Sequence, residues 1–324
     1  MVVDARWDDL PVVRSTVVSH RRVTGLSVEV IAELVAELGP VWQDRQQARL
    51  TARTRRRAVG AGARYRLVFV DRLLATLVCL RHGVTHDVLA AWFGVDRSTI
   101  TRAVGEIRPL LAERGCRVPG GVRLRTLADV VAYLDHVRAV ALMDATEIRV
   151  RRPSAGRAGR QRFVSGKSRT NAIKTLVLSD AQGRLLFCGA TVPGSTADIT
   201  QARQAGLTHW LAHTAGVRIL ADAGYQGLGA QTGGQVITPT LRHHKKALEH
   251  LPGIAELRQA QRREHARRRV RVEHAIAHLK NWRSLTRHLG RRDSLDTTVR
   301  AVAGLLSDHQ HTDRGKPIAA IPAI

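Results

Sequence analysis

The sequence predicts an α-helical N-terminal domain followed by an α/β domain in which helices flank a mixed sheet. Three observations lead to this fold class. Apolar residues recur at helical spacing in the first third, strand-like apolar runs bounded by turns fill the middle, and a long basic helix lies near the C-terminus. We expect a helical domain over residues 1–120, an α/β domain over 121–305, and a loosely attached or disordered tail over 306–324.

The helical domain contains the pattern of a helix-turn-helix. Residues 66–83 predict an apolar helix closed by Gly83, and residues 84–111 predict two helices joined by a tight turn at Gly94, with Asp96 placed to cap the second. The exposed side chains of that second helix suit base edges and phosphates in a major groove. They are Arg97, Ser98, Thr99, Thr101 and Arg102. An ordinary helical hairpin with a polar face is the alternative.

Two carboxylates are associated with apolar strands in the second domain. Residues 137–153 predict a buried strand with Asp144 in or near its end, and a later strand, 217–220, is followed by Asp222. An apolar hairpin and a short helix are expected between them, with Asp198 stabilising the N-terminus of that helix. Burying Asp144 is costly unless it is paired or binds a metal ion. A hydrogen bond from a neighbouring turn is the alternative.

Positive charge indicates a polyanionic partner. The chain has 52 Lys and Arg against 27 Asp and Glu, a formal charge of +25, and the arginines are clustered. Nucleic acid is the expected partner. Residues 153–171 form a basic loop with few apolar residues, in which Lys167 is expected to contact DNA.

The remaining composition predicts a reduced, cytoplasmic protein. The three cysteines are far apart and form no CxxC pair, which indicates free thiols rather than a disulfide framework or a zinc site. No apolar run approaches the roughly 20 residues that span a bilayer. The first ten residues carry acids where a signal peptide would be basic and then apolar. We expect no membrane partner, and association with the nucleoid when DNA is bound.

The basic helix over residues 267–285 carries one carboxylate, Glu273, among arginines. Arg269, Glu273 and Lys280 fall within about 40° of one another at roughly 100° per residue. Apolar residues repeat on another face, which favours packing on a core. Two explanations fit the lone acid: a solvated ion pair along the helix, or an acid held next to bound anions and metal.

The order of the expected elements supports the second explanation. Strand, hairpin, helix, strand and helix follow one another as in an RNase H-like fold, and this order brings Asp144, Asp222 and Glu273 toward one point. Three carboxylates at one point repel one another unless cations are present, and hard oxygen ligands suit Mg²⁺ or Mn²⁺. Two such ions would activate an attacking oxygen and stabilise the leaving one at phosphorus. Arg269 and Lys280 would hold phosphates beside the metals.

Several motifs, in this order, resemble the DDE-type transposases of bacterial insertion sequences, in the branch related to Harbinger transposases. They are FGVDRSTITR, MDATEI, SGKSRTNAIKTLVLSD, PGSTADI, ADAGYQG and the R-x3-E-x6-K pattern at Arg269, Glu273 and Lys280, within about residues 20–290. The resemblance implies that Asp144, Asp222 and Glu273 are metal-binding catalytic acids and that the N-terminal domain binds DNA ends. Related transposases often carry Tyr three residues before the Arg, where this chain has Ala266.

The expected function is a transposase that binds the terminal inverted repeats of its insertion sequence, cleaves the ends, and joins the 3′-hydroxyl to target DNA. Because two ends are brought together, a homodimer on DNA is expected. One alternative is a non-catalytic DNA-binding protein, either a regulator or a decayed transposase, although a pure binder has no use for three converging acids. A second alternative is a metal-dependent endonuclease without strand transfer, which shares the chemistry up to the choice of nucleophile.

Overall fold

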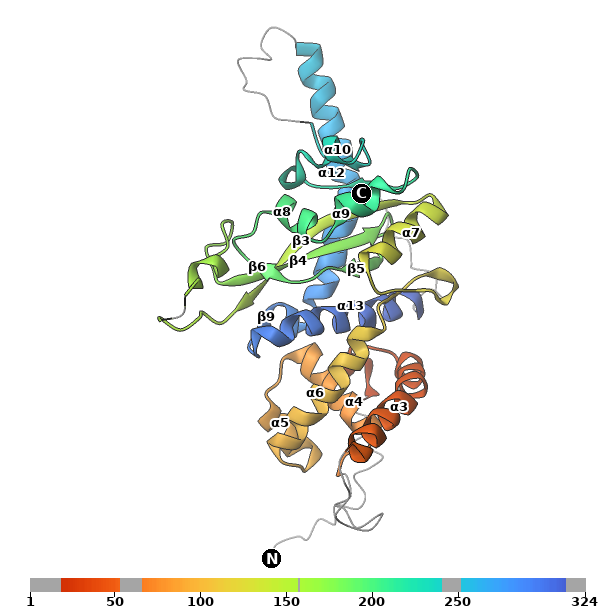
Figure 1. Ribbon diagram of the computed structural model, residues 1–324, viewed down its shortest axis with the longest axis vertical. Helices are drawn as coiled ribbons and strands as arrows, with labels where there is room; N and C mark the ends of the chain where they lie inside the picture. The colour runs from red at the N-terminus through yellow and green to blue at the C-terminus, as the bar shows by residue number, and fades with distance from the viewer. Residues whose placement is uncertain (1–18, 53–65, 157, 241–251, 313–324) are drawn as a thin grey trace, which may run out of the picture.

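The computed structural model describes residues 19–52, 66–156, 158–240 and 252–312. A group of N-terminal helices forms one end of the molecule, a mixed sheet with helices on both faces forms the middle, and the start of helix α12 (Pro252–Lys280) projects at the other end (Figure 1). The N-terminal helices are α2 (Arg21–Thr24), α3 (Val28–Thr51), α4 (Phe69–His82), α5 (His86–Phe93) and α6 (Arg97–Glu113). No helix among the described residues has the length and apolar character needed to cross a membrane.

The predicted helix-turn-helix is present as α5 and α6. Thr85 caps α5 by accepting a hydrogen bond from the backbone of Val88. Gly94 has a φ of +62°, a conformation that favours glycine, and its N–H closes the end of α5. Leu89 and Ile100 are fully buried where the two helices meet. Asp96 stands at the N-cap of α6 as predicted, but its side chain accepts no cap hydrogen bond.

A short antiparallel pair leads from the helical end to the sheet. Strands β1 (Cys116–Arg117) and β2 (Arg123–Leu124) are joined by the 3-10 turn η2 (Pro119–Gly121). Helix α7 (Leu127–Val137) follows and begins with a capping box, in which Thr126 and Asp129 bond each other's backbone N–H groups.

The sheet has the mixed topology expected of an RNase H-like fold. Its central path runs in the order β5-β4-β3-β7-β8. The strands β3, β4 and β5 are antiparallel, whereas β7 and β8 run parallel to β3. These strands are β3 (Val140–Val150), β4 (Ala172–Asp180), β5 (Leu185–Cys188), β7 (Arg218–Leu220) and β8 (Val236–Ile237). Two short strands extend the sheet, β6 (Val192–Pro193) on β4 and β9 (Arg287–His288) on β3.

Alternate residues of β3 pack on opposite faces of the sheet. Ala141 and Met143 join a core formed with α7, α8 and α9. Leu142 and Ile148 join the core on the face covered by α12 and α13. Since side chains alternate along a strand, Asp144 lies on the α12 side. The covering helices are α8 (Asp198–Gln204), α9 (Leu207–Ala212), α10 (Leu228–Gln231), α12 (Pro252–Lys280) and α13 (Leu295–Thr312).

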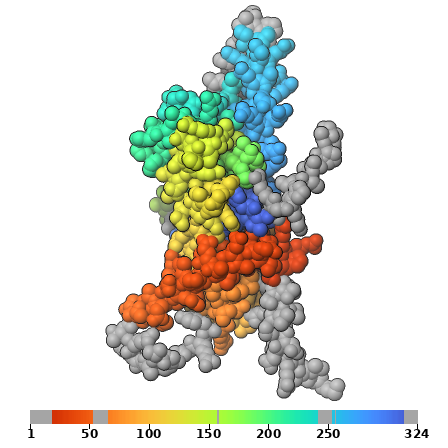
Figure 2. Space-filling model, turned by 90° about the vertical axis from the view of Figure 1, so that its right-hand side faces the viewer, coloured from red at the N-terminus to blue at the C-terminus, as the bar shows by residue number. Residues whose placement is uncertain are grey.

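The C-terminal helix α13 connects the two ends of the molecule. It packs against α6, β1 and β5 and also contacts α3. Figure 2 shows red α3 crossing directly below the blue of α13. Ser307 and Asp308 are 0% and 1% exposed, so the expectation of a loose tail from residue 306 is wrong for residues 306–312. Residues 307–312 are polar and show no apolar periodicity, so the sequence did not predict that they continue a buried helix. Residues 313–324 lie outside the described residues.

Candidate active site

Asp144 lies in the middle of β3, on the face covered by α12. Its side chain is 23% exposed, and one carboxylate oxygen accepts a hydrogen bond of 2.7 Å from the backbone N–H of Ala145. Burial raises the pKa of Asp144 above its ordinary value, and the nearby charges of Asp222 and Asp198 act in the same direction, while Arg269 opposes them. Burial therefore outweighs the stabilising charge of Arg269 at this carboxylate.

Asp222 follows the neighbouring parallel strand, β7. Leu142 pairs with Leu220 in the register of β3 and β7, so Asp144 and Asp222 are both two residues beyond a paired position and lie close together. Asp222 is the N-cap of the 3-10 turn η4 (Ala223–Tyr225), where it accepts a 2.7 Å hydrogen bond from the N–H of Ala223. Its side chain is 54% exposed. The site therefore opens to solvent on the Asp222 side.

Arg269 of α12 joins the two acids. Its Nη2 lies 3.0 Å from Asp144 Oδ2, and its Nη1 lies 3.4 Å from Asp222 Oδ1. The side chain is only 8% exposed, and its Nε is buried without a hydrogen-bond partner among the described residues. One turn earlier, His265 bonds the carbonyl of Ala221 at 2.9 Å, which fixes α12 beside the end of β7.

Glu273 is the one acid of the predicted set that does not join this pair. It follows Arg269 by one helical turn, and its side chain is exposed. Within the described ranges, it makes no hydrogen bond or ion pair with Asp144 or Asp222, and no three His, Cys, Asp or Glu side chains are grouped to hold a metal ion. The role of Glu273 as a ligand stays a prediction.

Three residues that the sequence reasoning did not assign to the site lie beside the acid pair. Asp198 forms an ion pair of 3.0 Å with Lys174 of β4. The hydroxyl of Tyr225 is fully buried without a hydrogen-bond partner in the described chain. Burial, followed by the charges of Asp198 and Asp144, raises the pKa of Tyr225. Asp198 lies in the motif PGSTADI and Tyr225 in the motif ADAGYQG. These motifs were the sequence signal that could have placed both residues at the site.

Lys280 points to the sheet rather than to the acid pair. Its Nζ donates to the carbonyl oxygens of Glu147 and Leu285, the second at 3.1 Å. Burial lowers the pKa of Lys280 to about 8. Both Arg269 and Lys280 are thus engaged by protein groups, and their contact with phosphates stays a prediction.

The basic loop after β3 is held by Glu147. Its carboxylate accepts hydrogen bonds from Ser165 at 2.6 Å and Ser168 at 2.9 Å. The backbone N–H of Lys167 donates to the Ser165 hydroxyl, and the Lys167 side chain is exposed. Glu147 therefore fixes the backbone from which Lys167 projects, a role that was not predicted from the sequence.

The predicted recognition surface of α6 faces solvent. Arg97, Ser98 and Arg102 are exposed, and Thr99 is half-buried. Arg102 donates to the carbonyl of Ser98 at 3.2 Å, and Arg97 lies 3.5 Å from Asp87. These contacts are at the surface and local, so the side chains are accessible to a ligand.

The family model of the DDE superfamily endonuclease matches residues 143–307, half of the chain. The chain belongs to the DDE superfamily of endonucleases. A second model, the helix-turn-helix of DDE superfamily endonuclease, matches residues 65–117. The predicted resemblance to DDE-type enzymes with an N-terminal helix-turn-helix is confirmed by these two matches. The helix-turn-helix precedes the acid pair in the chain.

One curated relative of this DDE endonuclease is a putative transposase for insertion sequence element IS112 from Streptomyces albus G. It is 26% identical over 229 residues, which cover 70% of this chain and 75% of the relative. Among solved structures, the crystal structure of the mariner Mos1 paired end complex with Mg matches with 13% identity and a TM-score of 0.24. That match covers 85% of this chain and 87% of the other. A TM-score this low does not establish a shared fold.

The acid pair of the DDE endonuclease fits a divalent cation. Carboxylate oxygens are the ligands that Mg²⁺ and Mn²⁺ prefer, and Asp144 and Asp222 already share one cationic group, Arg269. The unpartnered Tyr225 hydroxyl and Arg269 Nε are buried polar atoms, which are normally hydrogen-bonded. A hydrated cation would supply positive charge to the acids, and its bound water would donate a hydrogen bond to the Tyr225 hydroxyl oxygen.

Proposed function

We propose that the protein is a transposase that binds the terminal inverted repeats of its insertion sequence, cleaves the ends and joins the 3′-hydroxyl to target DNA. The observation that carries the proposal is the meeting of Asp144 and Asp222 at Arg269, in a chain of the DDE endonuclease superfamily. The putative transposase from Streptomyces albus G, similar over most of both chains, supports the same activity.

Asp144 and Asp222 would hold the divalent ions, with Glu273 completing the ligand set from α12. Two Mg²⁺ or Mn²⁺ ions supply activation of the attacking oxygen and charge stabilisation at phosphorus. Arg269 neutralises the acid pair between ion-binding events and fixes the separation of the two carboxylates. Asp198 would act on Asp144 only through its charge, which is largely compensated by the ion pair with Lys174 at 3.0 Å.

The N-terminal helices would bind the DNA ends. The exposed Arg97, Ser98 and Arg102 of α6, with half-buried Thr99, are the proposed contacts to bases and phosphates. Lys167 would contact the backbone near the acid pair. We assign residues 1–120 to end binding and 121–305 to catalysis, and propose a homodimer that holds two ends together in the cytoplasm, associated with the nucleoid.

The test is Mg²⁺-dependent cleavage of a duplex that carries the terminal repeats of the element. Replacing Asp222→Asn should lower cleavage by about a thousandfold or more, because a lost metal ligand removes several kcal/mol of transition-state stabilisation. End binding by the helix-turn-helix should be retained. Asp135→Asn is the matched control. Asp135 accepts a hydrogen bond from the backbone N–H of Gly216 and does not contact Arg269. Cleavage by Asp222→Asn at the wild-type rate would show that the site is elsewhere.

The same assay separates the alternative functions. A transposase joins the cleaved 3′-hydroxyl to a target plasmid, whereas an endonuclease without strand transfer stops at free ends. A regulator or decayed transposase binds the repeats and leaves them uncut at every Mg²⁺ and Mn²⁺ concentration.

A further inference from the structure

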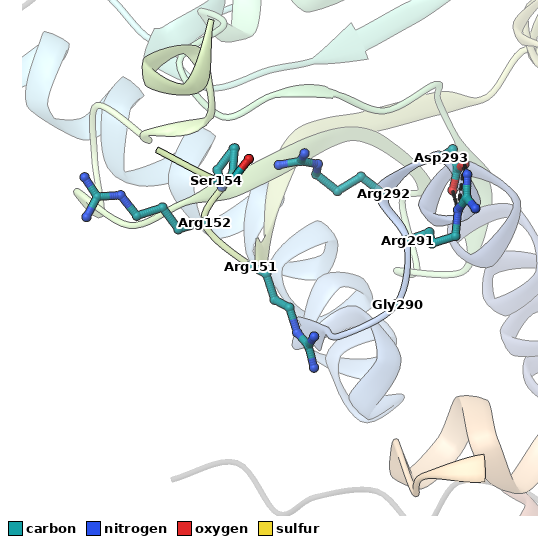
Figure 3. Close-up of a pocket in the computed structure, with 8 residues that line it drawn as sticks. Arg151, Arg152, Ser154, Gly290, Arg291, Arg292 and Asp293 are labelled. Atoms are coloured by element: carbon teal, nitrogen blue, oxygen red, sulfur yellow. Dashed lines mark hydrogen bonds and ion pairs between the residues drawn. The ribbon is translucent and has the colours of Figure 1, made fainter. Parts of the chain in front are cut away.

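A second cluster of arginines surrounds a pocket at the far end of β3. The pocket has a volume of about 410 Å³ and lies between the segment that follows β3 and the loop between β9 and the 3-10 turn η6 (Arg292–Ser294). Its lining residues are Arg151, Arg152, Pro153, Ser154, Gly290, Arg291, Arg292 and Asp293. Figure 3 shows Arg292 reaching across toward Ser154, while Arg152 points outward.

The positive charge of this arginine pocket is largely uncompensated. Its one acid, Asp293, binds Arg291 with an Nη2–Oδ2 distance of 2.7 Å. Arg151 and Arg152 are exposed, and neither forms an ion pair or a hydrogen bond with any other side chain in the described part of the chain. Four arginines and only one carboxylate therefore line this pocket. Such a surplus, concentrated in one hollow, favours an anionic ligand.

The loop that carries half of the pocket is held in place. Strand β9 pairs with the end of β3, with Val150 opposite His288. His288 is buried, and its Nε2 bonds the carbonyl of Arg291 at 3.0 Å. The Arg292 guanidinium lies 4.6 Å from the centre of the Phe163 ring, a distance typical of a cation–π contact. Arg292 is thus prepositioned before a ligand arrives.

The chemistry of the pocket fits the phosphodiesters of a nucleic-acid backbone. Guanidinium groups bind phosphate oxygens through paired N–H donors. The arginines also continue beyond the pocket. Arg149 and Arg287 are exposed and lie opposite each other in the register of β3 and β9, and Arg162 lies on Phe163 at 5.7 Å. A row of cations suits successive phosphates of one strand better than a single small anion.

The pocket is separate from the acid site. Arg151 follows Asp144 by seven residues along extended chain, which corresponds to about 20–25 Å at 3.3 Å per residue. That is about seven base pairs along a duplex. We propose that the arginine pocket binds backbone phosphates of the duplex whose end enters the acid site, and so sets the position of that duplex on the sheet. This inference rests on the proposed function, because it takes duplex DNA as the ligand.

The test measures the binding of a random-sequence duplex between about 50 and 200 mM salt, a range in which phosphate contacts change affinity strongly. The double variant Arg151→Gln/Arg152→Gln should bind about tenfold or more weakly at fixed salt, and its salt slope should fall by about one to two. The matched control is Arg203→Gln/Arg218→Gln. It removes two exposed arginines from elsewhere on the surface, and Arg218 pairs with Val140 at the opposite end of β3.

A conservative variant separates a phosphate contact from a general charge effect. Arg292→Lys keeps the charge and loses the paired donors, so it should weaken binding while leaving the salt slope near that of the wild type. Thermal unfolding of each variant checks that the fold is kept.

The outcomes distinguish the two proposals. If the wild type binds duplex and the Arg151→Gln/Arg152→Gln variant matches it in affinity and slope, the pocket is not a DNA site, while the proposed function stands. If both double variants lose affinity equally, the effect is one of net charge and the inference is overturned. If the wild type binds no duplex at any salt concentration, the proposed function and this inference both fail.

Discussion

Two buried arginines of this protein each lie between two acids, yet their surroundings differ. Arg114, at the C-terminal end of α6, donates to Glu37 of α3 through Nε at 3.0 Å and Nη2 at 2.7 Å, and to Asp308 of α13 through Nη1. Arg123 adds a 2.7 Å bond to Asp308. Every guanidinium nitrogen of Arg114 has an acidic partner, and the three helices are joined at one point.

Arg269 also lies between two acids, but its hydrogen bonding is incomplete. It reaches Asp144 and Asp222 through its two terminal nitrogens, but its Nε has no partner and Asp222 is half exposed. Complete hydrogen bonding is what a structural buried ion pair requires. A closed network therefore holds the fold. The open network at Arg269, where burial raises the pKa of Asp144 and the Arg269 Nε has no partner among the described residues, is available for a ligand.

The largest effect on stability is expected at the closed network. Arg114→Met leaves Asp308, which is 1% exposed, with Arg123 as its remaining cation. Removing one partner of a buried ion pair costs about 3–5 kcal/mol. Urea denaturation should show this loss in the free energy of unfolding. A loss below about 1 kcal/mol would mean that the network does not hold the helices together.

A smaller effect is expected at the open network. Arg269→Met should lower the free energy of unfolding by about 1–2 kcal/mol without metal, because Asp222 is half exposed and water screens its charge. Mg²⁺ should restore this stability, since a ligand that binds only the folded state stabilises it. Arg114→Met keeps the acid pair and Arg269, so it serves as the control and should gain only the smaller stability that Mg²⁺ gives to the wild type. An equal response of both variants would contradict the distinction between the two networks.

The smallest effect concerns Lys280, a half-buried cation bonded to carbonyls instead of acids. Its folded pKa is lowered to about 8 from 10.5 by burial. Between these values the unfolded chain binds the proton more than the folded one, so the unfolding free energy should rise with pH. Between about pH 8 and 9 we expect a rise on the order of 1 kcal/mol. Lys280→Met should lack this rise, and parallel pH profiles for both proteins would disprove the lowered pKa.

Local patterns made much of the fold predictable. The turn at Gly94, the hairpin between β4 and β5, and the strands carrying Asp144 and preceding Asp222 are all set by residues close in sequence. The meeting of these two acids followed from the order of the elements, because β7 runs parallel to the first part of β3 and ends beside Asp144 in the middle of that strand.

Long-range packing was not predictable in the same way. The helix spacing placed Arg269, Glu273 and Lys280 on one face, but packing of α12 on the sheet gives each of them a different environment. Arg269 meets the acids, Lys280 meets the backbone of β3, and Glu273 stays exposed. Likewise, Asp308 lies in a polar segment without periodicity, and only its partners on α6 and β2 explain its burial.

The helix-turn-helix, the order of the elements along the chain and the convergence of Asp144 and Asp222 were predictable from the sequence, since they depend on periodicity, turn residues and connection order. The tertiary structure decided which cation faces those carboxylates, which basic residues remain free for a ligand, and how α13 joins the helical end to the sheet. These depend on contacts between residues far apart in the chain, whose partners are chosen by packing and by the cost of burying an unpaired charge.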